Sequence, residues 1–412
     1  MVILADEYDH YLHLPKNGVN NNLRTFVFDV LGLEPVYNPK ARTDAPSLDK
    51  NAMLYWQATL DDGPGRRFLS MLRDKRDYDT ALQFLASYRR FWIPCREWPH
   101  WFRLHPTLNP TGTDTLRWSC VNPNGQQISK KDKVNLRRCL CPAPGREWWS
   151  LDAKNIELRI PAYESGEGDL IDLFERQSEP PFYGSQHLLN FSTVYPDIWQ
   201  EALGKFGPED AGKYCKTEYE SSWYQWCKNG DFAIQYNCGE RTADRAFHRN
   251  GSYIALKSRF AKLENLNQWC IAEARKKGYV ETIPDRSVDP DRGYPLLVSR
   301  TDYGDVMPTT PLNYRVSGSA CWWMIQAMIR CDEQLLRWAR EEPGFDGFIA
   351  LQIHDELLFD FPRGSGPEPH LTNLPKIRTI QKLMERGGDD IGVPTPVTVE
   401  YHSESWASGK VI

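Results

Sequence analysis

The chain has 412 residues, enough for a large core and for two or three domains. Its 41% hydrophobic and 25% charged residues are typical of a globular protein, and its net charge of −5 does not by itself indicate a nucleic-acid binder. No apolar run approaches the ~18 residues of a membrane span, and Asp6, Glu7 and Asp9 interrupt the N-terminal segment. We therefore expect no membrane span and no secretory signal peptide in this sequence.

The cysteines and tryptophans do not indicate a cofactor site. The ten cysteines include no CxxC pair and no histidine at zinc spacing, so we interpret them as reduced thiols of a cytoplasmic protein. We interpret the acidic run at 6–9 as surface charge rather than as a nuclease motif. The fifteen tryptophans are interpreted first as core residues, although tryptophan also suits surfaces that stack on rings.

Helical periodicity dominates the N-terminal part of the chain. The apolar spacing predicts helices over 23–33, 48–60 and 66–92. The segment 104–146 is irregular, polar and basic. Between 86 and 146 there are eleven basic and three acidic residues, a net charge of +8. Such a stretch either follows a phosphate backbone or forms a solvated basic face, and charge alone does not decide between the two.

The second half of the chain combines strands with longer helices. Residues 147–152 predict a buried strand that ends on Asp152. The elements predicted after it are a helix over 155–165, a mostly helical segment over 200–277, a proline-rich loop over 284–311 and a long helix over 314–340. Residues 348–361 contain two β-rich runs around an acidic turn, which predicts a hairpin. A short helix and a strand over 396–401 complete the series.

Two aspartates lie where apolar strands end. Asp152 closes the first strand, and Asp355 lies at the tip of the hairpin. Carboxylates among apolar neighbours are costly unless a positive group binds them, and two Asp groups at adjacent strand ends would suit Mg²⁺ in a phosphoryl transfer. Taken alone, each aspartate is more simply interpreted as a turn or cap acid.

A third feature lies between the two acids. Lys228, Phe232 and Tyr236 are spaced four residues apart, so they share one face if the segment is helical. From the spacing alone, such an aromatic stripe is most simply a portion of the core.

The residues around these positions resemble the family A DNA polymerases, the DNA polymerase I type. DAKNIELR at 152–159 resembles that family's motif A, and HDE at 354–356 its motif C. Lys228, Phe232 and Tyr236 match its motif B. Further matches are 115–129, GYVET at 278–282, Asn313 with SGSA at 317–320, and thumb-like segments at 26–35 and 43–50. Six motifs in the family's order make the resemblance, which covers 15–412, specific.

The resemblance implies an α+β right-hand polymerase with an antiparallel palm sheet, helical fingers and a short helical thumb. The implied domains are a shortened thumb over 1–104, a first palm segment with motif A over 105–165, fingers with motif B over 166–311, and a second palm segment with motif C over 312–412.

The resemblance also implies roles for individual residues. Asp152, Asp355 and Lys228 are implied to be catalytic. The metal ligands would be Asp152, the carbonyl of Ala153, Asp355 and Glu356. The implied nucleotide-binding residues are Asn155, Glu157, Lys228, Phe232 and Tyr236. The implied DNA-binding residues are Arg117, Asn124, Gln126, Arg137, Arg138, Arg159, Asn313 and His354.

The chain departs from the family pattern mainly around motif B. Tyr224 stands where the family usually has arginine, and Lys213, Lys216 or Arg241 are candidates to replace its phosphate contact. Further departures are Asn237 in place of a glycine, Ser317 in place of a glutamine, and Gly230 inside the predicted helix, where glycine costs roughly 1 kcal/mol of helix propensity.

The implied function is template-directed addition of deoxynucleotides to a primer 3′-hydroxyl, by a nucleotidyltransferase that uses two Mg²⁺ ions, with Mn²⁺ as a substitute. The implied partners are primer–template DNA and dNTPs. We expect a monomer that has no membrane association and no 3′–5′ exonuclease in this chain, with a separate exonuclease or processivity subunit left open. The expected location is the cytoplasm, or the host cytoplasm if the gene is from a phage.

Two alternatives stay open. One is a phage-type single-subunit RNA polymerase, although the IELR segment at 156–159 and Glu356 favour the DNA enzyme. The other is a non-catalytic DNA-binding subunit descended from a polymerase, although both metal acids are present.

Overall fold

The computed structural model describes residues 21–37, 46–110, 112–128, 134–219 and 223–412. The chain divides into two compact units. We call residues 1–80 with 176–259 the helical unit, and residues 81–175 with 260–412 the sheet unit.

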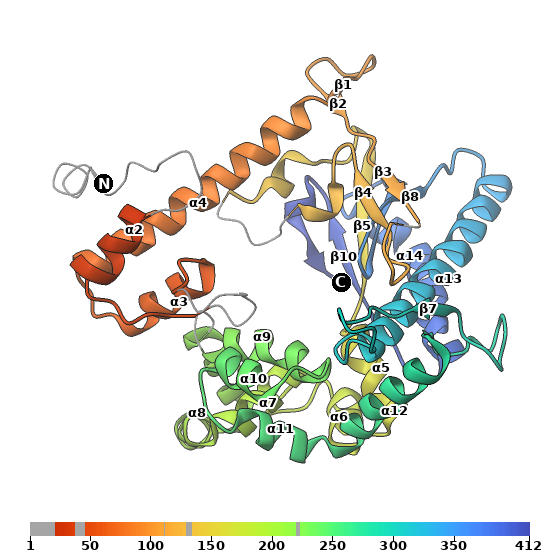
Figure 1. The fold of residues 1–412 in the computed structure, drawn as a ribbon. Helices are drawn as coiled ribbons and strands as arrows, with labels where there is room; N and C mark the ends of the chain where they lie inside the picture. The colour runs from red at the N-terminus through yellow and green to blue at the C-terminus, as the bar shows by residue number, and fades with distance from the viewer. Residues whose placement is uncertain (1–20, 38–45, 111, 129–133, 220–222) are drawn as a thin grey trace. The chain divides into compact units, whose positions relative to one another are not determined.

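The helical unit is built from helices of different lengths (Figure 1). Its elements are α2 (Asn21–Thr25), the π-helical turn η1 (Phe26–Val30), α3 (Lys50–Thr59), the first half of α4 (Pro64–Arg89), α7 (Gln186–Val194), α8 (Pro196–Glu218), α9 (Trp223–Gln235), α10 (Glu240–Phe247) and α11 (Ser252–Arg259).

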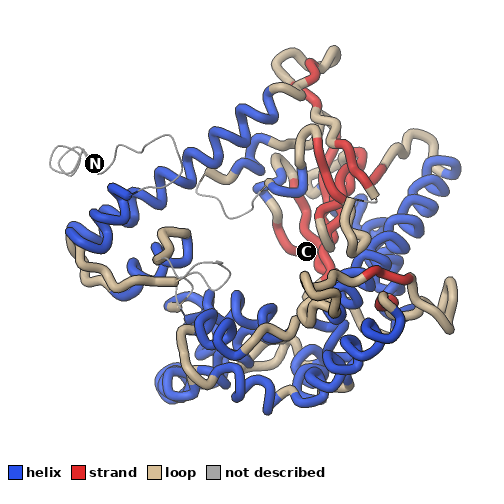
Figure 2. The backbone as a smooth tube through the Cα atoms, in the orientation of Figure 1, coloured by secondary structure: helices blue, strands red, loops and turns tan. Residues whose placement is uncertain are grey.

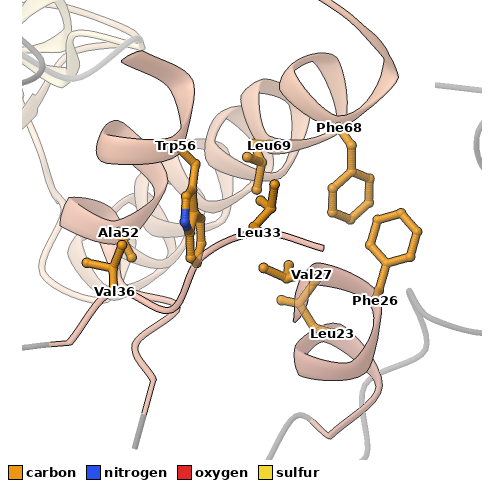
Figure 3. Close-up of a cluster of buried hydrophobic side chains, with 9 residues drawn as sticks. All are labelled: Leu23, Phe26, Val27, Leu33, Val36, Ala52, Trp56, Phe68 and Leu69. Atoms are coloured by element: carbon orange, nitrogen blue, oxygen red, sulfur yellow. The ribbon is translucent and has the colours of Figure 1, made fainter. Parts of the chain in front are cut away.

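One apolar cluster holds the N-terminal region of the helical unit together (Figure 3). Phe26 of η1 meets Phe68 of α4 edge to face, with ring centroids 4.5 Å apart, and Trp56 of α3 lies in the same cluster. The indole of Trp56 donates a hydrogen bond to the carbonyl of Glu34 at 2.8 Å, which satisfies its buried N–H. Asp49 caps α3 by accepting from the amide of Ala52 at 3.0 Å.

The sheet unit contains a five-stranded antiparallel sheet, drawn in red in Figure 2. Its strands are β5 (Arg146–Ala153), β8 (Phe348–Ile353), β9 (Glu356–Pro362), β10 (Val397–His402) and β11 (Lys410–Val411). The order across the sheet is β11-β10-β5-β9-β8. The strand that carries Asp152 is therefore central and lies directly beside the strand that follows Asp355.

Strands β5, β8, β9 and β10 form as predicted because apolar residues recur along each of them, whereas β11 was not predicted. Two long helices, α13 (Pro311–Glu341) and α14 (Pro369–Ile391), pack against each other and against strands of the sheet (Figure 1). A second cluster, which includes Tyr88 of α4, Leu358 of β9 and Trp406, packs onto the sheet as well.

Smaller elements complete the sheet unit. They are β1 (Ile93–Pro94), β2 (Phe102–Arg103), β3 (Thr107–Asn109), β4 (Ser119–Val121), η2 (Gly125–Gln127), η3 (Leu136–Cys139), α5 (Ile156–Ser165), α6 (Gly168–Glu175), α12 (Ala261–Lys277), β6 (Tyr279–Glu281), β7 (Pro295–Leu297) and η4 (Trp406–Ser408).

The structure confirms the predicted hairpin at 348–361 and the strand before Asp152. The continuous helix over 23–33 is wrong, because the chain forms α2 and then a π-helical turn there. The helix after the hairpin is not short, since α14 has 23 residues. The acidic run at 6–9 lies outside the described residues. Over the ranges that the structure describes, no helix has the length and apolar character to cross a membrane.

The domain boundaries stay a prediction. The compact units divide the chain by packing, and they place residues 260–311 with the sheet and 176–259 with the N-terminal helices. A division by packing does not define a division by function.

Candidate active site

The two aspartates singled out by the sequence lie close together, Asp152 on β5 and Asp355 in the turn that leads into the neighbouring strand β9. In the register of β5 and β9, Asp152 pairs with Glu356. The amide of Ala153 donates a hydrogen bond to the carbonyl of Asp355 at 3.0 Å. The backbone hydrogen bonds between the strands thus hold both acids where β5 ends and β9 begins.

These acids differ in exposure and in electrostatic environment. Asp152 is exposed, while Asp355 and Glu356 are half-buried. Burial raises the pKa of the Asp355 carboxyl, and the negative charge of Glu356 adds to this effect, whereas His354 and Arg117 oppose it. A cation bound beside Asp355 would offset the cost of ionising this buried carboxyl.

The donor set suits a divalent cation that prefers oxygen ligands. Mg²⁺ is usually held by one or two carboxylates and keeps other positions for water and phosphate oxygens. Asp152 and Asp355 offer two carboxylates, and the carbonyl of Ala153 and the carboxylate of Glu356 are close in the register. Among the described residues no three His, Cys, Asp or Glu side chains form a complete metal site. The arrangement fits an ion that substrate oxygens help to hold.

A polar network joins Arg117, Glu157 of α5 and Ser317 of α13. Glu157, in the first turn of α5, receives hydrogen bonds through one carboxylate oxygen from the guanidinium of Arg117 and from the hydroxyl of Ser317 on α13, the latter at 3.1 Å. Arg117 also interacts with the thiol of Cys321, whose pKa burial raises to about 11. Asn155 begins α5 in a left-handed conformation with φ 54° and is exposed.

The predicted template-contacting residues are tied to the sheet. Asn124 caps η2 by accepting from the amide of Gln126 at 3.1 Å. The side-chain amide of Gln126 donates to the side chain of Gln352 at 2.8 Å and to its carbonyl at 3.2 Å. Gln352 in turn donates to the carbonyl of His354 at 2.6 Å. Asn124 and Gln126 are thus connected to the turn that carries Asp355.

Two predicted DNA contacts, Arg159 and Arg137, are buried, and their role in DNA binding stays a prediction. Arg159 is buried, stacks on Phe174, and donates to the backbone carbonyls of Lys154 and Pro394 at 3.1 and 3.2 Å. Its guanidinium therefore links backbone segments of the sheet unit.

Arg137 is also buried. Its guanidinium lies 3.8 Å from the ring centroid of Trp406 and donates to the carbonyl of Ile128 at 3.1 Å. Its charge still acts on the acids, because its interactions include those with Glu356 and Asp152. In contrast, Arg138 and His354 are exposed, and Asn313 is half-buried.

The helix α9 in the helical unit carries the predicted nucleotide-binding stripe. The ammonium of Lys228 lies 4.4 Å from the ring centroid of Tyr224, and the rings of Phe232 and Tyr236 are 6.3 Å apart and stacked. Tyr236 directly follows the helix, and its amide donates to the carbonyl of Phe232 at 3.0 Å. These four residues therefore line one face, with Phe232 exposed.

A buried acid of this helix was not predicted. Asp231 accepts a hydrogen bond from Asn190 at 2.8 Å and lies 2.5 Å from Nδ1 of His187, both on α7. The ring of His187 lies 6.3 Å from that of Tyr224 and 6.4 Å from that of Phe232. No local sequence signal links residues more than forty positions apart, so this cluster could be found only in the folded chain.

Comparison with solved structures identifies the class of fold. The POL domain of Pol1 from M. smegmatis, solved in complex with DNA primer-template and dNTP, matches with a TM-score of 0.68 at 22% identity, over 99% of this chain and 64% of that chain. The predicted fold class, an α+β right-hand polymerase, is confirmed.

The family model described as DNA polymerase family A matches residues 20–200 and 228–408, so the chain belongs to this family. It is 26% identical over 316 residues to DNA polymerase I of Lactococcus lactis, covering 75% of this chain and 32% of that protein. It is 25% identical over 402 residues to DNA polymerase I of Mycobacterium bovis, covering 94% and 38%. The chain spans about a third of the length of these relatives.

Proposed function

We propose that this protein is a template-directed DNA polymerase that adds deoxynucleotides to a primer 3′-hydroxyl. The observation that carries the proposal is the backbone contact between β5 and the turn before β9, which brings Asp152 and Asp355 together in a chain of family A. The reaction would be attack of the primer hydroxyl on the α-phosphate of a deoxynucleoside triphosphate, with pyrophosphate as the leaving group.

In this proposal Asp152 and Asp355 hold two Mg²⁺ ions, or Mn²⁺ as a substitute, with the Ala153 carbonyl and Glu356 as further ligands. Bound ions of this kind supply Lewis acidity and charge neutralisation at the attacking and leaving oxygens. The raised pKa of Asp355 supports the assignment, because a carboxylate that is costly to ionise gains most from a nearby cation.

The chain's own side chains would bind and orient the substrates. Lys228 would neutralise the triphosphate as a point charge, and the exposed ring of Phe232 would lie against the incoming base and sugar. Tyr236 would stack near the template–primer junction, and Glu157, with Asn155 beside it, would face the sugar. The primer and template contacts would be Arg117, Asn124, Gln126, Arg138, Asn313 and His354. Catalysis of this kind is mostly positioning and electrostatic stabilisation.

The proposed partners are primer–template DNA and dNTPs. The support is the fold shared with the M. smegmatis domain, whose structure was solved with DNA primer-template and dNTP.

Extension of a labelled primer on a longer template tests the proposal. We expect the wild type to extend with dNTPs and Mg²⁺, and we expect Asp355→Ala and the isosteric Asp355→Asn to lose at least a hundredfold in rate, as removal of a charge-stabilising group typically does. Asp302→Ala, at an exposed loop acid, is the matched control and should extend as the wild type does.

Three outcomes would contradict the proposal. Extension with ribonucleotides alone would indicate an RNA polymerase. Binding of primed DNA without extension in Mg²⁺ or Mn²⁺ would indicate a non-catalytic subunit. Full activity of Asp355→Asn would remove Asp355 from the metal site.

A further inference from the structure

A small aromatic hairpin in the sheet unit is not used by the proposed reaction. Residues 89–103, with the sequence RRFWIPCREWPHWFR, follow the C-terminal end of α4 and form the hairpin of β1 and β2 (Figure 1). We call this segment the β1–β2 hairpin. It forms a two-stranded sheet of its own, apart from the five-stranded sheet.

The large rings of this hairpin are exposed. Trp92, Trp101 and Phe102 have 40%, 38% and 48% of their surface accessible. The interpretation of the tryptophans as core residues holds for Trp56, Trp149, Trp323 and Trp406, and it is wrong for Trp92 and Trp101. Neighbouring exposed rings are an unusual use of residues that normally fill cores or contact a ligand.

Both faces of the hairpin present a ring. Pro94 pairs with Phe102 and Ile93 with Arg103 in the register of the strands. The ring of Trp92 lies 4.9 Å from that of Phe102, so these two share a face. Residues at i and i+2 of a strand share a face, so Trp101 lies on the same side as Arg103. Trp92 and Phe102 therefore lie on one face of the hairpin and Trp101 on the other, so the three rings do not form one apolar patch.

The charge of the hairpin is strongly positive. It contains four arginines and a single acid, Glu97. Arg89, Arg90 and Arg96 are exposed. Arg103 pairs with Glu97 at 3.4 Å, and its guanidinium lies 5.8 Å from the ring centroid of Trp98. Guanidinium groups set among rings complement a polyanion that also offers flat faces for stacking.

Single-stranded nucleic acid has this chemistry. A duplex offers phosphates but hides the faces of its bases, whereas unpaired bases stack on exposed aromatic side chains while arginines follow the backbone. A lipid surface fits less well, because the turn of the hairpin carries Arg96, Glu97 and His100, and insertion would bury these polar groups.

We propose that the β1–β2 hairpin binds single-stranded nucleic acid, with Trp92, Trp101 and Phe102 stacking on unpaired bases and Arg89, Arg90 and Arg96 neutralising phosphates. This surface is separate from the residues assigned above to primer, template and nucleotide, and its action requires no catalytic step.

The test measures the affinity of the full chain for a fluorescein-labelled oligothymidylate of about twenty nucleotides by fluorescence anisotropy. The double variant Trp101→Ala/Phe102→Ala should weaken binding roughly tenfold or more, since each lost stacking contact has an effect of this order. Trp101→Phe keeps a ring and should retain most of the affinity. Tyr303→Ala, which removes a ring that is 99% exposed in a loop, is the matched control and should change nothing.

A second pair of variants tests the charges without touching the rings. Arg90→Ala/Arg96→Ala should weaken binding and should flatten its dependence on salt, because fewer counterions are released. Arg340→Ala, at an exposed arginine of α13, is the control. Thermal melting of every variant checks the fold. Any binding elsewhere on the chain contributes equally to all variants, so the differences report on the hairpin.

Unchanged affinity in both hairpin variants would overturn the proposal. Sedimentation with phosphatidylserine vesicles tests the lipid alternative. If the hairpin variants no longer sediment with the vesicles but bind oligothymidylate as the wild type does, the hairpin is a lipid-binding surface and the proposal is overturned. The assay measures binding alone, so a chain that fails to extend primers would still give a result for the hairpin, and a chain that extends primers could still fail this test.

Discussion

The hydroxyl of Ser317 on α13 donates a hydrogen bond to the carboxylate of Glu157 on α5, with 3.1 Å between Oγ and Oε1. The guanidinium of Arg117 binds the same oxygen. The family usually has a glutamine at the position of Ser317. In this chain the shorter serine side chain contacts Glu157, the acid that we propose faces the sugar of the nucleotide. The orientation of Glu157 therefore depends on two other segments of the sheet unit.

Replacement of Glu157 by alanine should relax discrimination against ribonucleotides. The proposed role of this carboxylate is to exclude the 2′-hydroxyl, and a contact of this kind accounts for roughly ten- to two-hundredfold in selectivity. Incorporation of single ribo- and deoxynucleotides by a primer-extension assay gives the ratio. Ser317→Ala removes one supporting hydrogen bond and should change the ratio only a few-fold, while Glu333→Ala, at an exposed acid of α13, should leave it unchanged. An unaltered ratio in Glu157→Ala would remove this residue from the sugar site.

Replacement of Phe232 by tyrosine should increase the use of dideoxynucleotides relative to deoxynucleotides. The ring of Phe232 is exposed on α9, within the stripe that starts at Tyr224, so a new hydroxyl at its edge would be available to a bound sugar. Chain termination at a fixed ratio of the two nucleotides measures the effect, for which we expect roughly tenfold or more. Phe206→Tyr on α8 is the control, and an equal response in the two variants would argue against the assignment of α9.

The strands that carry the proposed metal ligands could be predicted because their signal is local. An apolar run that ends on an acid predicts both β5 and the hairpin of β8 and β9, and the register then brings Asp152 beside Glu356. The departure at Asn237 also has a local explanation. Its φ of 58° lies in the left-handed region that favours glycine, and asparagine is the side chain that best tolerates this conformation.

Burial of charged residues could not be predicted in the same way. Arginine is rarely buried, and Arg159 is buried only because carbonyls from distant segments, such as that of Pro394, accept its hydrogen bonds. The family model likewise leaves residues 201–227 unmatched, and Tyr224 lies in this gap. The stretch that departs from the family pattern therefore includes the first residues of α9.

The buried carboxyl of Asp231 should make stability depend on pH. Burial raises its pKa above the usual 3.8, while hydrogen bonds from His187 and Asn190 oppose the shift. A carboxyl with a raised pKa holds its proton in the folded chain, so its stabilising contribution is present below pH 3.8 and is lost as the pH rises through the folded pKa.

Asp231→Asn removes this titration. The melting temperature of the variant minus that of the wild type should therefore increase from pH 4 towards pH 8, whatever its value at the acidic end. Asp332→Asn, at an exposed acid of α13, should show no such trend. A difference that stays constant over this range would show that Asp231 keeps the same charge throughout.

Gly230 should be a required glycine of α9, in spite of its unfavourable helix propensity. A Cβ atom there would lie 2.4 Å from two ring carbons of Phe247 on α10, so the two helices are close enough only without a side chain. Gly230→Ala would gain about 1 kcal/mol of helix propensity but would force a buried ring to move, which typically costs about 1–3 kcal/mol. Urea denaturation should therefore show a loss of stability in Gly230→Ala. Gly204→Ala on α8, where a Cβ would meet no atom within 4 Å, should gain roughly 0.5–1 kcal/mol. Equal stabilisation of both variants would mean that Phe247 moves aside freely, and that the contact between α9 and α10 does not depend on this glycine.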